Sequence, residues 1–336
     1  MSFSKVYFDG SSEKSNAAQE SSYEETWRHP ENSGKCGQYP DCRRDRRRVP
    51  KRMRLLLLSC LTMIAFASNS ILNRVGIADG DMDATNFGIL RLIAGAVMLA
   101  VLVVLRSGRI RLGGDGRWIG VSSLLAYTFC FSFAYESLDA GLGALVLFGL
   151  VQITMFTGAL ISGERPALQR WLGAAVAFGG LVWLLWPGAA TAPSLLHALS
   201  MAGAGIAWGV YSLNGRGSAD ALEATAANFI FAAGLAGLFG LGQIVLPSGA
   251  GLPEATLFGL SMAILCGAVT SGVGYAMWYT VLPHLRSTTA AVLQLTVPVI
   301  AMAGGALLLA ESVDLRLAIA AILVLGGVLL AVTSRR

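Results

Sequence analysis

The amino-acid sequence predicts an all-α integral membrane protein whose ten transmembrane helices form two inverted five-helix repeats. Three observations carry this prediction: the composition, a series of ten apolar segments, and a phrase that occurs twice. The chain has 336 residues, of which 54% are hydrophobic and only 13% are charged. A soluble chain of this length carries about 25% charged residues and lacks uninterrupted apolar segments of membrane length.

The charged residues are concentrated in an N-terminal leader, residues 1–54. The leader holds 12 of the 25 Lys and Arg residues and 8 of the 20 Asp and Glu residues. It has no apolar core before a cleavage site, which excludes a signal peptide, and its composition predicts a disordered, basic cytoplasmic segment. Met53 opens the stretch "MRLLLL" and is an alternative start of translation.

The cysteines and histidines predict neither a disulfide framework nor a metal site. Cys36 and Cys42 lie in the leader near His29, but their spacing does not resemble that of a zinc site. The other three cysteines lie inside apolar segments, where a thiol behaves as a small hydrophobe; they are Cys60, Cys130 and Cys266.

Ten segments are long and apolar enough to cross the hydrocarbon core, which takes roughly 20 residues at about 1.5 Å rise each. Gly, Pro, Asp and Asn residues, which favour turns, cluster at most of the joints between them. The segments lie at about 55–78, 84–106, 117–138, 140–163, 168–187, 194–214, 221–246, 255–282, 286–310 and 313–333.

The distribution of arginines predicts the orientation. With the N-terminus in the cytoplasm, thirteen Lys and Arg residues fall in the inner loops, and only Arg74 and Arg316 fall on the outer side. The positive-inside rule then places both termini in the cytoplasm and the chain in the cell (inner) membrane. The arginines thus account for the net charge of +5, which does not indicate nucleic-acid binding.

The repeated phrase predicts the inverted arrangement. "GALVLFGLVQITMFTGALISGE" (143–164) returns as "AAVLQLTVPVIAMAGGALLLAE" (290–311), and each copy ends in a glutamate. Each copy occupies the fourth segment of a set of five, so the repeats are residues 55–190 and 191–336. Because five is odd, the second set enters the membrane from the opposite side, an architecture found in many secondary transporters.

Several stretches resemble the EamA-type branch of the drug/metabolite transporter superfamily. They are "FASNSILNR" (66–74), "DATNFGILRLIAGAVML" (83–99), "FSFAYESLDAGLGALVLFGLVQITM" (131–155), "GIAWGVYSLNGRG" (205–217), "SGVGYAMWYTVLP" (271–283) and "AVLQLTVPVIAMAGGALLLAE" (291–311). The resemblance covers residues 55–333 and implies ten helices around a central cavity. It also implies secondary transport, usually export, of small metabolites, without enzymatic activity or a cofactor.

Two charged side chains are candidates for functional roles. Arg91 lies about seven residues into the second segment, where a charge needs a partner or a wet cavity. It either contacts substrate, pairs with Glu136 or Asp139, or extends to the lipid headgroups. Glu136, near the outer end of the third segment, is the candidate for coupling protons to transport.

Polar and aromatic side chains within the segments are candidates for lining the cavity. Amides in the membrane need hydrogen-bond partners, either in a cavity wall or on a neighbouring helix. Aromatic rings suit amphipathic metabolites, although many only anchor the chain at the membrane interface, as we expect for Tyr279. The candidates are Asn69, Asn73, Gln152, Gln294, Tyr135, Trp208, Tyr211, Tyr275 and Trp278.

Three smaller expectations complete the set. Pro298 interrupts the ninth segment and is a hinge candidate. Glu164 and Glu311 each order a loop at the end of a segment. Small-residue pairs such as Gly205 and Gly209 are helix-packing surfaces.

The sequence therefore predicts an exporter of small amino-acid-like or amphipathic metabolites that works by alternating access. A proton gradient or a counter-substrate drives it, its other partner is the lipid bilayer, and it is a monomer or homodimer. One alternative is a membrane-embedded lipid-modifying enzyme, for which no histidine has a carboxylate arranged nearby by sequence. The other is a cation pump of the small multidrug type, which expects an acid in the first segment, where residues 55–78 have none.

Overall fold

The computed structural model describes residues 51–79, 82–114, 116–161, 167–186, 194–215, 218, 220–245, 256–285 and 293–333. Within these ranges all regular structure is helical and no strand occurs. The predictions made for residues 1–50 and for Glu164 lie outside the described residues.

The described residues form ten helical segments, as the apolar pattern predicts. Six of them are long and apolar enough to cross a membrane, and α12 and α13 are apolar but shorter. In chain order the segments are α2 (Lys51–Arg74) continued by the π-helix η3 (Val75–Asp79), α3 (Ala84–Ser107), α4 (Arg117–Ala134), α5 (Ala140–Ile161), α6 (Leu168–Leu185), α7 (Leu195–Gly215), α8 (Ala221–Val245), α9 (Leu257–Leu265) continued by the π-helix η4 (Cys266–Val273), α10 (Gly274–Val281) and the short 3₁₀ turn η5 (Leu282–His284), α12 (Thr296–Leu308) and α13 (Leu315–Val332).

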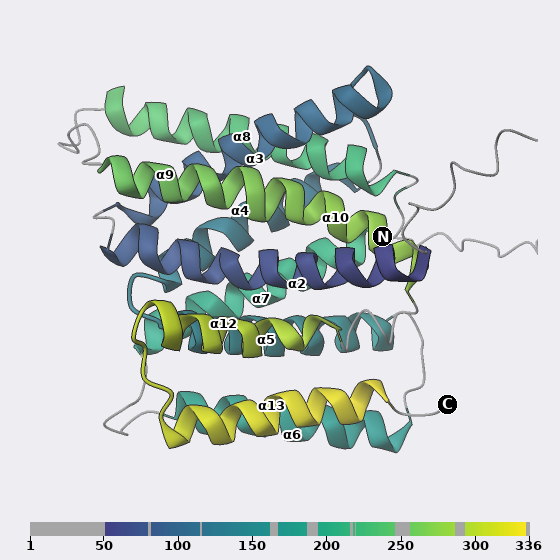
Figure 1. Ribbon diagram of the computed structural model, residues 1–336, viewed down its shortest axis with the longest axis vertical. Coiled ribbons are helices and arrows are strands. Elements are labelled where there is room, and N and C mark those ends of the chain that lie inside the picture. The colour runs from purple at the N-terminus through teal and green to yellow at the C-terminus, as the bar shows by residue number, and fades with distance from the viewer. Residues whose placement is uncertain are drawn as a thin grey trace, which may run out of the picture. The chain divides into compact units, whose positions relative to one another are not determined.

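The helices pack in reciprocal pairs (Figure 1). The first segment contacts the eighth and ninth (α2 with α10 and α12), and the sixth contacts the third and fourth (α7 with α4 and α5). Likewise the second contacts the eighth (α3 with η4), and the seventh contacts the third (α8 with α4). Three further interfaces join segments that hold the same position in the two predicted repeats: α3 with α8, α5 with α12, and α6 with α13.

Close helix contacts depend on glycines, as predicted for Gly205 and Gly209. A Cβ atom on Gly205 of α7 would lie 2.7 Å from the Leu147 carbonyl oxygen of α5. The same holds between α6 and α13, where a Cβ on Gly173 would lie 2.5 Å from the Gly327 carbonyl oxygen. Small residues let helix backbones approach closely, which is how helices associate where lipid competes for apolar side chains.

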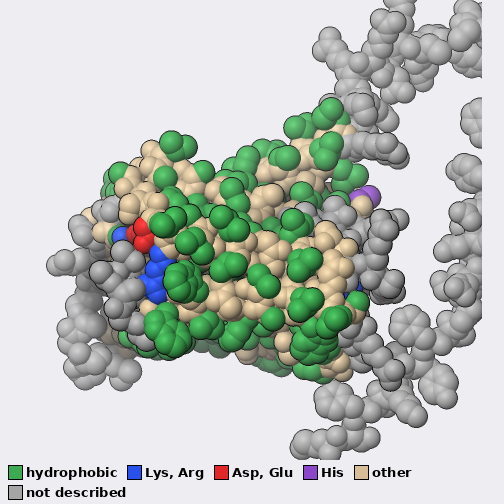
Figure 2. All heavy atoms as spheres, turned by 90° about the horizontal axis from the view of Figure 1, so that it is seen from below, with side chains coloured by type: hydrophobic (Ala, Val, Ile, Leu, Met, Phe, Trp, Pro, Cys, Tyr) green, Lys and Arg blue, Asp and Glu red, His purple; other side chains and the backbone are tan. Residues whose placement is uncertain are grey.

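Apolar side chains cover the outside of the bundle, while polar ones collect inside it. Figure 2 shows apolar side chains spread across one face, with acidic and basic ones gathered near one end. Large exposed side chains include Leu105, Ile161 and Leu307, whereas Arg91, Asn73 and Ser132 are almost fully buried. This distribution is the reverse of a soluble protein's and fits a surface in contact with lipid.

The ninth segment is interrupted near Pro298. The residues just before it, Leu293 and Gln294, are helical, Leu295 forms a turn, and α12 begins at Thr296; the predicted start at residue 286 lies outside the described residues. Pro298 lies in the first turn of α12 and has no N–H group to donate to the carbonyl of Gln294, which accounts for the interruption. The role of Pro298 as a hinge stays a prediction.

The glutamate that closes the repeated phrase has a structural role at the end of α12. The Glu311 carboxylate folds back over Gly305, leaving no room for a side chain there. Between them Ala310 adopts a left-handed conformation with φ of 53°. Glu311 accepts hydrogen bonds from the Ala140 N–H group at the start of α5, at 2.8 and 3.0 Å. An anion at a helix N-terminus is stabilising, so Glu311 orders this loop as predicted.

Candidate functional site

A network of buried polar side chains lies inside the bundle and joins α2, α3, α4 and the π-helix η4. Asn69 donates to the Tyr127 hydroxyl at 3.0 Å and accepts from the Cys266 thiol at 2.9 Å. Asn73 donates to the Cys266 sulfur at 3.1 Å and accepts from Ser132 at 3.0 Å. Three segments distant in sequence, α2, α4 and η4, therefore meet at the two asparagines of α2.

The π-helix η4 explains how Cys266 and its neighbours reach this network. A π-helix has a wider turn than an α-helix and is frequent at functional sites. Here it turns the Thr270 hydroxyl toward Asn69, at 3.2 Å, and the Ser271 hydroxyl toward Arg91, at 3.1 Å. Gly267 lies directly against the Arg91 carbonyl oxygen, where a Cβ atom would not fit.

Arg91 is the charged member of the network. Its guanidinium donates from Nε to Ser271 and from one terminal nitrogen to the Tyr127 hydroxyl at 3.1 Å. It also lies 5.1 Å from the ring centre of Tyr127 and 5.0 Å from that of Phe131. Its second terminal nitrogen is buried and has no hydrogen-bond partner in the described part of the chain.

Aromatic rings stand beside the polar network and enclose a small cavity. Trp208 lies 4.9 Å from both Tyr127 and Tyr275, measured between ring centres, and Phe66 packs edge-on against Trp208 and Tyr275. The cavity between them has a volume of about 10 Å³, and Asn69 contributes to its wall. A space of this size holds about one water molecule.

A much larger cleft, of about 520 Å³, opens at the end of the bundle that carries Arg117. Its wall includes Tyr211, Asn228 and Tyr279, and Tyr211 stacks on Trp208 at 5.5 Å. The stacked pair Tyr211–Trp208 therefore separates the cleft from the small cavity. We call this end of the bundle the Arg117 end.

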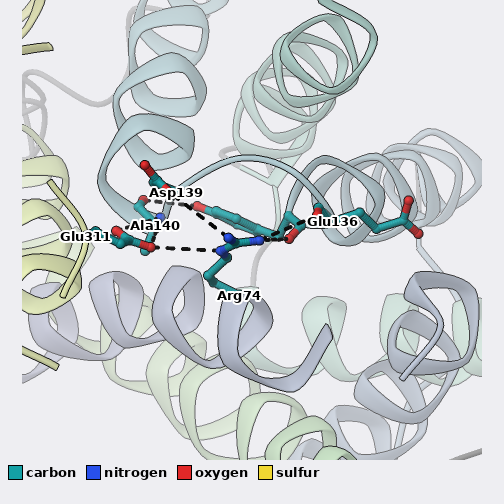
Figure 3. A network of polar contacts seen from close by, with 6 residues as sticks. Arg74, Glu136, Asp139, Ala140 and Glu311 are labelled. Atoms are coloured by element: carbon teal, nitrogen blue, oxygen red, sulfur yellow. Dashed lines mark hydrogen bonds and ion pairs between the residues drawn. The ribbon is translucent and has the colours of Figure 1, made fainter. Parts of the chain in front are cut away.

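The opposite end, which we call the Arg74 end, is tied together by the contacts shown in Figure 3. Arg74 at the end of α2 lies 4.0 Å from Asp139 and 4.0 Å from Glu311. It also donates to the Tyr135 carbonyl oxygen at 3.2 Å, and so joins α2 to the ends of α4, α5 and α12. Burial raises the pKa of the Glu311 carboxyl above its ordinary value, and the Ala140 N–H group and Arg74 offset this only in part.

Six of the predicted site residues lie in the network, at the small cavity or in the cleft. Asn69, Asn73 and Arg91 belong to the network. Trp208 and Tyr275 border the small cavity, and Tyr211 lines the cleft.

The other predicted residues lie elsewhere. Tyr135 is fully buried at the Arg74 end, where its ring packs against Phe131. Trp278 is buried, and its ring centre lies 5.9 Å from that of Phe66. Gln294 is buried just before α12. Gln152, on α5, has a buried amide nitrogen without a partner among the described residues. Glu136 is exposed at the end of α4.

Four expectations are corrected by the structure. Arg91 does not pair with Glu136 or Asp139. Instead Arg74, at the end of α2, forms the ion pair with Asp139. Cys266 is a hydrogen-bonding member of the network and not only a small hydrophobe. Tyr279 lines the cleft, so it is not merely an interfacial anchor.

The fourth correction concerns the histidines. His197 at the start of α7 has a carboxylate nearby after all, because Glu136 of α4 lies 3.8 Å from its Nε2 atom. His197 Nδ1 also contacts the Ser194 hydroxyl at 2.7 Å. The two helix ends meet only in the folded chain, so the sequence spacing of these residues gave no sign of the contact.

Sequence reasoning missed Tyr127, Thr270 and Ser271. A tyrosine or a small hydroxyl residue in an apolar segment is common, so its presence alone carries little signal. The stretch "GAVTSGVG" (267–274) was the available sign, because three glycines and two hydroxyls in the middle of a span weaken a regular helix.

An all-helical chain with helices of membrane length and an apolar exterior is a multi-pass membrane protein. The model of the EamA-like transporter family matches it twice, over residues 53–186 and residues 195–333. The chain therefore belongs to the EamA-like transporter family, and the resemblance read from its sequence is confirmed.

Two individual proteins are also similar to this chain. An uncharacterized protein of Pseudomonas aeruginosa is 47% identical over 285 residues, which cover 84% of this chain and 96% of that protein. The crystal structure of another protein superposes with a TM-score of 0.57 at 17% sequence identity, over 83% of this chain and 97% of that one. At this identity the structural likeness shows the fold alone.

Proposed function

We propose that this protein is a secondary transporter that exports small metabolites from the cytoplasm by alternating access. The observation that carries the proposal is the contrast along one path through the bundle. A cleft of about 520 Å³ leads from the Arg117 end to Tyr211, which stacks on Trp208, while ion pairs join the helix ends at the Arg74 end beyond the polar network. This is the arrangement expected of a transporter whose site faces one side of the membrane.

Two observations fit the inverted repeat predicted from the sequence, which would support the same mechanism. The family model matches the chain in two consecutive halves, residues 53–186 and 195–333. Each major helix interface within the bundle has a counterpart in which the roles of the halves are exchanged. Two halves related in this way can exchange conformations, so that the closed end opens and the open end closes around one site.

The positions of the arginines support the direction. The Arg117 end carries Arg106, Arg111 and Arg117, and the positive-inside rule assigns such an end to the cytoplasm. The cleft then opens to the cytoplasm in this conformation, ready to load a metabolite for export.

The proposal is tested by reconstituting the full chain in liposomes and measuring counterflow of pooled radiolabelled carboxylic acids, amino acids, nucleosides and amines. The Trp208→Ala variant is expected to reduce counterflow about tenfold or more, because it removes the ring between cleft and cavity. Trp183→Ala is the matched control, because Trp183 lies on the exposed face of α6. Equal losses in both variants, or none in either, would count against this path.

The enzyme alternative rests on one observation, the contact series Ser194–His197–Glu136. It resembles the serine, histidine and acid of a nucleophilic site in composition. However, the His197–Glu136 separation of 3.8 Å exceeds a hydrogen bond, and Glu136 is exposed. Turnover of lipid without counterflow of any compound would favour the enzyme over the transporter.

A further inference from the structure

Arg91 is a buried cation, and no anionic side chain of the described residues lies beside it. Arg91 is 2% exposed, and the groups it contacts are neutral: the Ser271 and Tyr127 hydroxyls and the faces of two rings. Within the described residues the ion pairs involve Arg74, Arg106 and His197, and none reaches Arg91. The interior of the bundle therefore carries an uncompensated positive charge.

Within the described residues, the acidic side chains lie at helix ends and not beside Arg91. At the Arg74 end they include Glu136, Asp139 and Glu311, and at the Arg117 end Asp220 and Glu223 line the cleft. Contacts with ring faces offset only part of the cost of burying a guanidinium. An anion brought to Arg91 from outside the protein would gain the attraction that no residue here supplies.

Two buried polar atoms mark where such an anion would be held. One terminal nitrogen of Arg91 has no partner, and the Tyr275 hydroxyl has none either. The two belong to one group, because Arg91 donates to the Tyr127 hydroxyl, and Tyr127 and Tyr275 line the same small cavity. Buried donors without partners are rare and costly, so a pair of them at one place indicates a site for an acceptor.

We propose that Arg91 and Tyr275 bind the carboxylate of a transported organic anion whose apolar body lies among Phe66, Trp208 and Tyr275. This substrate class rests on the proposed transport function. A carboxylate would accept from the free guanidinium nitrogen and the free hydroxyl, and so satisfy both. An ammonium group would meet no carboxylate in this network and would be repelled by Arg91. The site therefore favours carboxylates over zwitterions and amines.

The anion would enter from the 520 Å³ cleft, past Tyr211 and Trp208. The cavity beside Asn69 now has a volume of about 10 Å³, which is too small for a ring-sized body. Binding thus requires Trp208 to move away from Tyr275. Trp208 fluorescence is consequently expected to respond to the ligand directly.

Three compounds with the same ring and different charge test the proposal on the full chain in lipid nanodiscs: phenylacetate, phenylalanine and phenethylamine. Binding is measured by calorimetry and by tryptophan fluorescence. We expect phenylacetate to bind about tenfold to a hundredfold more tightly than the other two, the range typical of a hydrogen-bonded charge. Equal affinities, or a preference for the zwitterion or the amine, would overturn the proposal.

Variants locate the effect at Arg91. Arg91→Gln is expected to abolish the preference for phenylacetate, whereas Arg91→Lys retains part of it because the charge remains. Since either change could disturb folding, Tyr275→Phe provides a milder test. It removes only the hydroxyl and should weaken phenylacetate binding several-fold while leaving phenethylamine binding unchanged. A Tyr275→Phe variant that binds all three compounds as the parent does would contradict the site.

Different experimental results would refute the proposed substrate class and the proposed transport function. Counterflow of amines without counterflow of phenylacetate would refute the anion site and leave the transporter standing. Charge-selective binding of phenylacetate without counterflow of any compound would support the anion site and refute the transporter.

Discussion

The two ends of the bundle are each organised by an arginine, but the two arginines connect different numbers of elements. Arg74 joins the end of α2 to the Tyr135 carbonyl, to Asp139 before α5, and to Glu311 after α12. Arg117 bonds mainly to its own preceding loop and to α8, through the Ala224 carbonyl and the Asn228 side chain, both at 2.7 Å.

The difference indicates what would close one end of the bundle in the proposed transporter. Arg117 makes shorter hydrogen bonds than Arg74, yet the cleft lies beside it. The bonds of Arg117 join α4 to α8. Arg74 makes longer contacts, but they join the end of α2 to three other helix ends. In the proposed mechanism, closure thus depends on which elements are joined, and not on the strength of each contact.

The largest expected difference between the ends is in solvent access. With the five cysteines replaced by serine, Ser218→Cys in the cleft and Ser70→Cys beside the small cavity are labelled with a soluble maleimide. Ser70→Cys should react about a hundredfold more slowly, because reaction requires opening that costs about 3 kcal/mol. Similar rates would mean that the Arg74 end is not closed.

Glu311→Ala should weaken the closed end. The change leaves the Ala140 N–H group without its acceptor and Arg74 with Asp139 as its remaining carboxylate, at a cost of about 1–2 kcal/mol. Labelling of Ser70→Cys should then rise about tenfold. The matched control is Glu223→Ala, which removes a carboxylate at the Arg117 end and should leave this rate unchanged. An equal rise in both variants would indicate general loosening.

Acidification should strengthen the closed end slightly. Burial raises the pKa of Glu311 in the closed state, whereas a hydrated carboxyl keeps its ordinary value. The closed state therefore binds the proton of Glu311 more tightly than the open state does. The free energy that favours the closed state over the open state grows as the pH falls from the raised pKa toward the ordinary one.

The measurement is the labelling rate of Ser70→Cys relative to Ser218→Cys, which cancels the pH dependence of the thiol. The ratio should fall several-fold on acidification. Glu311→Gln should remove this dependence. A ratio that rises on acidification would contradict the sign.

The smallest effect is expected at the turn that carries Glu311. Ala310 has φ of 53°, a conformation that costs a non-glycine residue energy. Ala310→Gly should therefore stabilise the protein by about 0.5–1 kcal/mol, seen as a higher thermal unfolding midpoint in detergent. Ala306→Gly, inside α12, is the control and should lower stability by about 1 kcal/mol. A lower midpoint for Ala310→Gly would mean that the turn is not strained.

Sequence reasoning identified three members of the network for a specific reason. Arg91, Asn69 and Asn73 stand out because charges and amides are costly in an apolar segment. Tyr127 and Ser271 do not stand out, because a hydroxyl group in an apolar segment has a small free-energy cost. Cys266 looked apolar because a thiol's hydrogen bonds appear only when acceptors are placed beside it.

The sequence by itself determined that the chain is a helical membrane protein of the EamA-like family and where its ten helices lie, since long apolar segments permit no other backbone structure in lipid. Only the tertiary structure decided that Arg91 faces hydroxyls and rings, while Arg74 takes the carboxylates. The physical reason is that the free energy of placing a side chain in the membrane depends on that side chain's own chemistry, which can be read from the sequence. The partners of the side chain depend on how helices that are far apart in the chain pack together and are rotated about their axes.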